Sequence, residues 1–264
     1  LYDFYLKGIN REQGWGAFHW KSSEILTAEQ IERAMSNLSL ADYQREYDAS
    51  FETQTGEPYH SYTELNNKRR VYDPDRPVVV TCDFNATEKP MSWVIGQRCN
   101  ESGNDVTYWL KVLSNQFTHT KMMCEITDEY FRSLGRYPRS LHFYGDYAGT
   151  RHESNSSFSD WEIIESFFRN KSVFKKFLQP CKSIRNSIAA TNGQLLNSLG
   201  VRKQFVNPET CKPLIADWQK CSWKPNSREL NDDDDLRGHA CRAVDYFNDF
   251  EYPVAARGGV LSVS

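Results

Sequence analysis

The sequence has 264 residues, of which 39 % are hydrophobic and 14 % aromatic, and its formal net charge at pH 7 is −3. This length allows one large or two small globular domains with real cores. The slightly negative charge excludes a globally basic nucleic-acid protein, so any nucleic-acid contact must be local. No apolar run approaches the roughly 20 residues of a membrane span. The seven scattered cysteines lack metal-ligand spacing and fit free thiols in a reducing cytoplasm, so we expect a soluble protein with no membrane partner.

Residues 1–70 are predicted to be helical and irregular. Thr27 opens one helix with a capping box, and a second helix is expected at Leu40–Tyr47. The first twenty residues are rich in aromatic side chains but carry no complete domain pattern, so we interpret them as the tail of a larger unit. A charged, proline-punctuated stretch at 68–77 then marks a boundary. We therefore expect one domain at 71–264, preceded by a different unit at 1–70.

Three segments of strand composition follow this boundary, at Val78–Asp83, Ser92–Arg98 and Val106–Leu113. Turn-forming residues at 100–104 make the last two a hairpin. Helices are expected at Phe117–Glu125, Asp128–Leu134, Trp161–Arg169 and Lys182–Leu199, with a fourth strand ending near Gly145. Three consecutive antiparallel strands followed by alternating helices and strands are the order of a ribonuclease H-like α/β domain. The predicted fold is thus a mixed sheet flanked by helices.

Two of the predicted strands end on an aspartate. Asp83 follows the run Val78–Cys82, and Asp146 follows Leu141–Gly145. Open α/β sheets place their ligands at the carboxyl ends of strands. Two carboxylates brought together there make a site for Mg²⁺ or Mn²⁺, and such sites hydrolyse phosphodiesters with two ions. An isolated strand-end aspartate is more often a turn cap, but a pair of them favours the metal site.

A third acid is usually needed, and the C-terminal segment supplies candidates. His239, Arg242 and Asp245 recur every three residues of a predicted helix, so we expect them on roughly one face. Asp245 is the preferred third carboxylate and Asp235 the reserve. The run of four aspartates that includes Asp235 is otherwise a solvated loop.

The segment between Ser166 and Pro208 contains no acidic residue. This local positive charge suits a DNA backbone, although a solvated helix face is the alternative. The predicted DNA-binding residues are Lys171, Lys175, Lys176, Lys182, Arg185, Arg202 and Lys203.

Taken in order, several motifs resemble the C-terminal part of the large terminase subunit of tailed bacteriophages. The resemblance rests on Cys82–Asn85, Gly145–Gly149 with Ser159–Trp161, Ile184–Asn192, Val206–Ile215 and His239–Phe247. Each motif is weak alone, but their order extends over nearly two hundred residues. Residues 20–60 resemble the end of the family's ATPase domain and its linker. No GxxxxGK[ST] phosphate loop occurs in this sequence, so the family's ATP site is absent from it.

The resemblance implies a metal-dependent endonuclease that cuts duplex DNA during genome packaging with little sequence preference. Asp83 and Asp146 match the first two metal-binding acids of the family. The family's closing helix reads histidine, two residues, aspartate, alanine, and Arg242 holds the place of that aspartate here. Asp245 lies one turn further along and could supply the carboxylate. The resemblance also implies a terminase small subunit and a portal protein as partners, in the host bacterial cytoplasm.

Two other functions are compatible with the same residues. Another ribonuclease H-like enzyme, such as a junction resolvase or a transposase, would share the acidic site. If Arg242 disables the site, the chain would instead be a DNA-binding module of the packaging motor.

Overall fold

The computed structural model describes residues 2–49, 56–85, 88–151, 158–178, 183–225, 227, 229–231 and 234–254. Its strands are β1 (Val78–Asp83), β2 (Met91–Glu101), β3 (Asn104–Asn115), β4 (Leu141–Gly145), β5 (Val173–Lys176) and β6 (Gln204–Val206). Its α-helices are α1 (Tyr2–Ile9), α2 (Ala28–Asn37), α3 (Leu40–Tyr47), α4 (Thr120–Ser133), α5 (Asp160–Phe167), α6 (Ile184–Leu195), α7 (Lys212–Lys220) and α8 (His239–Glu251). Short 3₁₀ turns lie at Ser22–Glu24 (η1), Glu64–Asn66 (η2) and Tyr147–Thr150 (η3). None of the helices in these ranges is long and apolar enough to cross a membrane.

The six strands form one mixed sheet in the order β5-β4-β1-β2-β3-β6. β1, β2 and β3 pair antiparallel, whereas β4 lies parallel to both β1 and β5, and β6 lies parallel to β3. This arrangement confirms the predicted ribonuclease H-like α/β fold. The β2–β3 hairpin turns through Ser102 and Gly103, both at positive φ, as the turn-forming sequence there predicts.

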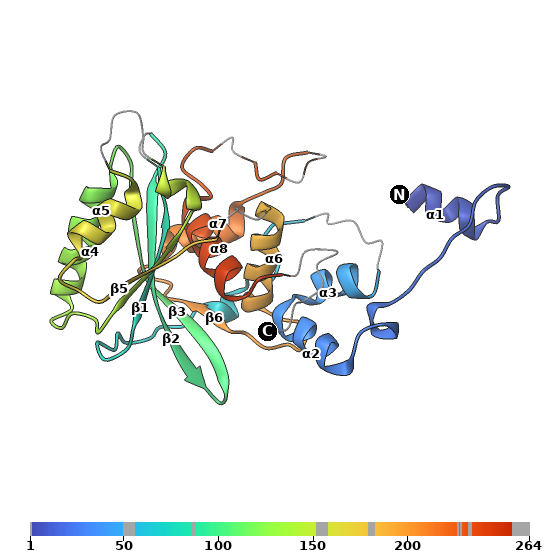
Figure 1. Ribbon diagram of the computed structural model, residues 1–264, viewed down its shortest axis with the longest axis horizontal. Coiled ribbons are helices and arrows are strands. Elements are labelled where there is room, and N and C mark those ends of the chain that lie inside the picture. The colour runs from blue at the N-terminus through green and yellow to red at the C-terminus, as the bar shows by residue number, and fades with distance from the viewer. Residues whose placement is uncertain are drawn as a thin grey trace.

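Helices cover both faces of the sheet (Figure 1). α4 and α5 cover one face and α6, α7 and α8 the other. The alternation of side chains along β1 separates the two cores: Val78, Val80 and Cys82 join the α4–α5 side, and Val79 joins the α8 side. Thr81 also faces α8, because its hydroxyl donates a hydrogen bond to the carbonyl of Ala243. Every second residue of β1 is therefore directed at α8.

Two short strands and the helix α7 were not predicted. β5 and β6 have four and three residues, too short for a periodic signal, and parallel pairing at the sheet edges defines them. The two helices predicted between 117 and 134 form a single helix, α4, which ends before Gly135 at φ 81°. The predicted capping boxes at Thr27 and Ser159 are confirmed.

The N-terminal helices α2 and α3 are attached to the α/β body through the end of α2. The last four carbonyls of a helix lack partners within it, and here the loop after α6 satisfies some of them. The Ser198 amide donates to the Leu38 carbonyl at 2.8 Å, and Lys203 Nζ donates to the Ser36 carbonyl at 2.9 Å. These contacts fix α2 against α6.

The segment between α3 and β1 also contributes to the body. Tyr59 is buried in the core beneath α8, and Asn66 donates from Nδ2 to the carbonyls of Leu195 and Gln204, both at 2.9 Å. Residues 56–67 thus pack with the α/β domain, and the domain boundary at residues 70 and 71 stays a prediction.

The contact between α2 and α6 depends on a glycine. A Cβ added at Gly193 would lie 1.8 Å from the carbonyl oxygen of Asn37, a backbone atom that cannot move alone. We therefore expect Gly193→Ala to destabilise the protein by about 1–3 kcal/mol or more, because overpacking usually costs this much. Thermal unfolding followed by circular dichroism measures this loss. Gly56→Ala is the matched control, since nothing lies within 4 Å of its added Cβ, and equal melting temperatures for the two variants would contradict the tight contact.

Candidate active site

The carboxyl ends of β1 and β4 bring Asp83 and Asp146 to the same edge of the sheet. These strands are parallel and pair Cys82 with Gly145, so the two aspartates follow at the same level. Adjacent strands lie about 4.8 Å apart. Asp83 follows Thr81 by two residues and so faces α8, and Asp146 accepts a hydrogen bond from the Tyr246 hydroxyl of α8 at 3.3 Å. Both carboxylates therefore face α8.

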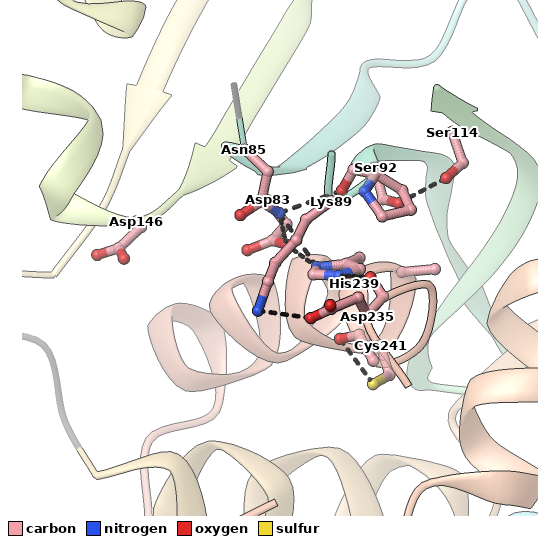
Figure 2. Close-up of polar contacts among 12 residues, drawn as sticks. Asp83, Asn85, Lys89, Ser92, Ser114, Asp146, Asp235, His239 and Cys241 are labelled. Atoms are coloured by element: carbon pink, nitrogen blue, oxygen red, sulfur yellow. Dashed lines mark hydrogen bonds and ion pairs between the residues drawn. The ribbon is translucent and has the colours of Figure 1, made fainter. Parts of the chain in front are cut away.

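Hydrogen bonds orient the Asp83 side chain, which is only 13 % exposed. Its Oδ2 accepts from Asn85 Nδ2 at 2.7 Å and lies 2.9 Å from His239 Nδ1. His239 Nε2 lies 3.0 Å from the carbonyl of Asp235, which can only accept, so this nitrogen carries a proton. Burial would lower the pKa of His239, but the hydrogen bond to Asp83 and the charge of that carboxylate outweigh burial and raise it. Figure 2 shows Asp83 and His239 directed at each other, with Asp146 to one side.

Asp146 is held as the N-cap of the 3₁₀ turn that follows β4. Its Oδ1 accepts from the Ala148 amide at 3.0 Å, and its carbonyl accepts from Trp161 Nε1 at 3.1 Å. The turn packs so tightly that a Cβ at Gly149 would lie 2.8 Å from the Phe84 ring. The glycine of this motif thus permits a close approach of backbone to ring, which sets the position of Asp146.

The structure does not bring Asp245 to this pair. Its side chain is fully buried, Oδ1 accepting from the Thr191 hydroxyl at 2.6 Å and Oδ2 from the Tyr59 hydroxyl at 2.8 Å. Arg242 Nη1 lies 3.6 Å from Oδ2. Burial raises the pKa of Asp245 to about 6, although the Arg242 charge and the two hydrogen bonds oppose this.

Helix geometry explains the placement of Asp245. Each residue turns a helix by about 100°, so steps of three residues drift backward by about 60° each. From His239 to Asp245 the drift is about 120°, which turns Asp245 toward α6. Tyr246 lies seven residues after His239 and returns to its face. His239 and Tyr246 are therefore the residues of α8 that contact the aspartates, and Arg242 lies between them and Asp245 around the helix.

The reserve candidate Asp235 lies near the site but is turned outward. Its Oδ1 forms an ion pair with Lys89 Nζ at 3.1 Å, and its side chain is 66 % exposed. Two other aspartates of the acidic run, at 232 and 233, lie outside the described residues. Among the residues that are described, no three His, Cys, Asp or Glu side chains are placed to hold a metal ion together.

Asp83 and Asp146 are the described residues that could hold a hard cation. The hydrogen bonds to Asp83 engage Oδ2, which leaves Oδ1 for a metal. Carboxylate oxygens and water are the ligands that Mg²⁺ and Mn²⁺ prefer. Arg242 holds the position at which the family resemblance implies a further carboxylate.

A residue that no local sequence pattern indicates holds the start of α8. Asp217 of α7 accepts hydrogen bonds from the amides of Gly238, Ala240 and Cys241 at 3.0, 2.9 and 3.2 Å. It therefore caps a helix from more than twenty residues away in the sequence, which no local pattern indicates. Tyr246 was also missed, although its seven-residue spacing from His239 was visible.

The predicted DNA-binding residues do not form one surface. β5, which carries Lys175 and Lys176, and β6, which follows Arg202 and Lys203, lie at opposite edges of the sheet. Lys175 and Lys176 form ion pairs with Glu165 and Glu251 at 2.8 and 2.9 Å.

The other predicted DNA-binding residues have varied surroundings. Arg202 Nη1 donates to Asn66 Oδ1 at 2.7 Å, and burial lowers the pKa of both Arg202 and Lys203. Lys171 Nζ lies 3.7 Å from the Tyr137 ring centroid. Arg185 is the second residue of α6, and Lys182 lies outside the described residues. Arg202 and Lys203 thus form contacts within the fold, to Asn66 and to the Ser36 carbonyl.

Comparisons with known proteins found similarity only among solved structures; no family model and no curated protein matches this chain. The large terminase of a thermophilic bacteriophage, in complex with ATP-gamma-S, matches with a TM-score of 0.63 and 15 % identity, over 94 % of this chain and 58 % of that one. The P22 large terminase nuclease domain matches with a TM-score of 0.49 and 12 % identity, over 74 % and 90 %. The SPP1 large terminase nuclease domain with bound Mn matches at 0.42 and 11 %, over 64 % and 84 %.

The structural neighbours thus include large terminases and their nuclease domains. The match to the thermophilic-phage large terminase shows a shared fold, and this chain spans a little over half the length of that protein.

Proposed function

We propose that this chain carries the nuclease of a bacteriophage large terminase subunit and cuts duplex DNA with a divalent metal ion. The observation that carries this proposal is the placement of Asp83 and Asp146 at the ends of two adjacent parallel strands, on the face covered by α8. The extent of the fold similarity to the thermophilic-phage large terminase supports the family. Mg²⁺ or Mn²⁺ is the proposed cofactor.

In the proposed metal-dependent cleavage, each residue near Asp83 and Asp146 has a distinct role. Asp83 and Asp146 would hold the cation, which when bound would supply an activated water. Asn85 and His239 fix the Asp83 carboxylate, and Tyr246 fixes Asp146. Such hydrogen bonds to ligating carboxylates set their direction and reduce the reorganisation needed during reaction.

The proposed setting is genome packaging. Double-stranded DNA is the substrate, and a terminase small subunit and a portal protein are the proposed protein partners, in the host bacterial cytoplasm. Since the chain spans 58 % of the thermophilic-phage large terminase, ATP-driven translocation would belong to a longer protein.

Cleavage of supercoiled plasmid tests the proposal. We expect nicking and linearisation with Mn²⁺ or Mg²⁺ and none with EDTA. A four-way junction of matched length separates the alternatives, because a resolvase would cut the junction and leave the plasmid intact. Failure to cut either DNA at any metal concentration would overturn the nuclease assignment.

A second function, DNA binding without cleavage, is favoured by one observation. Near the two aspartates, α8 carries Arg242 where a third carboxylate would be expected. Asp245 is buried among Thr191, Tyr59 and Arg242. If one ion is insufficient for hydrolysis, the chain would bind duplex DNA but leave it intact. Plasmid binding in a gel-shift assay, with no cleavage at saturating Mn²⁺, would favour this function.

The salt dependence of duplex binding should distinguish two groups among the predicted basic residues. Lys175→Glu should weaken duplex binding and flatten its salt dependence by roughly one unit of slope, since each phosphate contact contributes about that much. Lys203→Gln should leave the slope unchanged and lower the melting temperature, because this lysine binds the Ser36 carbonyl of α2. Fluorescence anisotropy at several salt concentrations measures the slope. A reduced slope for Lys203→Gln, with none for Lys175→Glu, would contradict this division.

A further inference from the structure

Arg242 lies on α8 within one turn of both residues of this helix that contact the two aspartates. His239 precedes it by three residues and contacts Asp83, and Tyr246 follows it by four and contacts Asp146. The guanidinium lies over the Tyr246 ring, 5.3 Å from its centroid. The charges of Tyr246, Asp245, Tyr59 and Asp83 raise the pKa of Arg242 against the effect of burial. Arg242 thus remains a cation within electrostatic range of Asp83.

The guanidinium is anchored from the side away from the aspartates. Nη1 lies 3.6 Å from Asp245 Oδ2 and 3.5 Å from the Ser187 hydroxyl. Asp245 is itself fixed by Thr191 and Tyr59. These two contacts engage Nη1, and a further side-chain hydrogen bond links Arg242 to Tyr246. A guanidinium carries five N–H donors, so others remain for a ligand. The Arg242 side chain is 21 % exposed, which keeps it within reach of one.

The negative charge of a bound substrate would exceed what one divalent ion offsets, and the Arg242 guanidinium could offset the remainder. Asp83 and Asp146 bring two negative charges, which one divalent ion offsets. A bound phosphodiester adds another negative charge, which grows at the leaving oxygen during hydrolysis, and a second metal ion would normally stabilise it. A guanidinium is permanently charged and binds phosphate oxygens with two parallel hydrogen bonds.

We propose that Arg242 binds the scissile phosphate and takes the place of a second metal ion, so that this site works with one divalent ion and one arginine. This inference rests on the proposed nuclease function. Asp245 then serves as the positioning residue of Arg242, because its buried carboxylate holds the guanidinium against α8. Arginine clamps of this kind stabilise transferred phosphoryl groups in other enzymes.

Two variants of the full chain separate the role of Arg242 in binding phosphate from its role in folding. Arg242→Lys keeps a positive charge beside Asp245 but loses the planar fork. The double variant Arg242→Gln/Asp245→Asn removes both charges, so neither is left buried alone. Arg98→Gln is the matched control. This arginine also pairs with a carboxylate, Glu251 at 2.9 Å, and lies 6.0 Å from a tyrosine ring centroid. It lies near the end of β2 that is remote from Asp83, which pairs with Ser92.

The experiment combines calorimetric titration with Mn²⁺ and plasmid cleavage kinetics, after circular dichroism has confirmed each fold. We expect one Mn²⁺ per chain for the wild type and for both variants, since Arg242 is not a ligand. We expect kcat to fall about 10²-fold or more in both variants, with a smaller change in KM, as when one donor to a developing charge is lost. Arg98→Gln should cleave like the wild type.

Different outcomes overturn different statements. Two Mn²⁺ ions per wild-type chain, or wild-type kcat for the folded double variant, would overturn the role of Arg242 while leaving the nuclease intact. A wild-type chain that never cuts DNA would overturn the proposed function instead, and the Mn²⁺ stoichiometry would still decide whether the site takes one ion or two.

Discussion

Asp83→Ala should reduce Mn²⁺-dependent plasmid cleavage by more than about 10²-fold, because the substitution takes away charge stabilisation worth several kcal/mol. It removes one of the two carboxylates that face α8 at the strand ends. Asp146→Ala should have the same effect, because both side chains would hold the same ion. Initial rates of plasmid nicking at saturating Mn²⁺ measure the loss.

Two controls separate this effect from damage to the fold. Asp83→Asn keeps the shape of the side chain beside Asn85 and His239 and should be as inactive as the alanine variant. Asp105→Ala removes a carboxylate that is 64 % exposed on β3 and should cleave normally. Rates for Asp83→Ala that match the wild type would remove Asp83 from the site.

Asp245→Ala should destabilise the protein by about 3–5 kcal/mol, the usual effect of removing one partner from a buried ion pair. The change leaves Arg242 without its anion and leaves the Tyr59 and Thr191 hydroxyls without their acceptor. For a chain of this size the melting temperature should fall by roughly 10 °C. Urea unfolding followed by tryptophan fluorescence gives the free energy directly.

Asp245→Asn is the conservative comparison, since it keeps one acceptor oxygen and the same volume, and should cost less stability than alanine. Normal stability of Asp245→Ala combined with lost Mn²⁺ binding would instead make Asp245 a metal ligand, as the sequence pattern predicted.

The pH dependence of Asp245 provides a separate prediction. Its pKa of about 6 in the folded protein lies above the value of about 3.9 in an unfolded chain. The folded state therefore holds this proton more tightly, so its contribution to stability is full below about pH 4 and is lost as the pH rises through about 6. Relative to Asp245→Asn, the wild type should lose stability between about pH 4 and 7. Unfolding free energies of the two proteins that change in parallel over this range would contradict the raised pKa.

Local sequence signals predicted that Asp83 and Asp146 lie at strand ends because this geometry is local. A strand that ends on an aspartate places that side chain at the end of the sheet where ligands bind. The antiparallel strands β2 and β3 occupy one side of β1, which leaves the other side for β4. Asp83 and Asp146 could therefore be selected before their pairing was known. The fold class followed from the same order of elements.

The remaining contacts depend on distances in sequence that no local pattern covers. Tyr59 reaches Asp245 across 186 residues, and Lys203 reaches Ser36 across 167. The basic run from 169 to 203 looked continuous in the sequence, but the fold divides it between the two edges of the sheet. The spacing of His239, Arg242 and Asp245 predicts one helix face, but six residues turn a helix by about 120° away from that face, and Asp245 contacts Thr191 of α6.

The most direct test of the central proposal is the position of a bound ion in a crystal of this chain soaked with Mn²⁺. An anomalous difference map should show a peak between the carboxylates of Asp83 and Asp146, and that peak should vanish in crystals of Asp83→Ala. A peak confined to the acidic run at 232–235, with none at the ends of β1 and β4, would contradict the proposed active site.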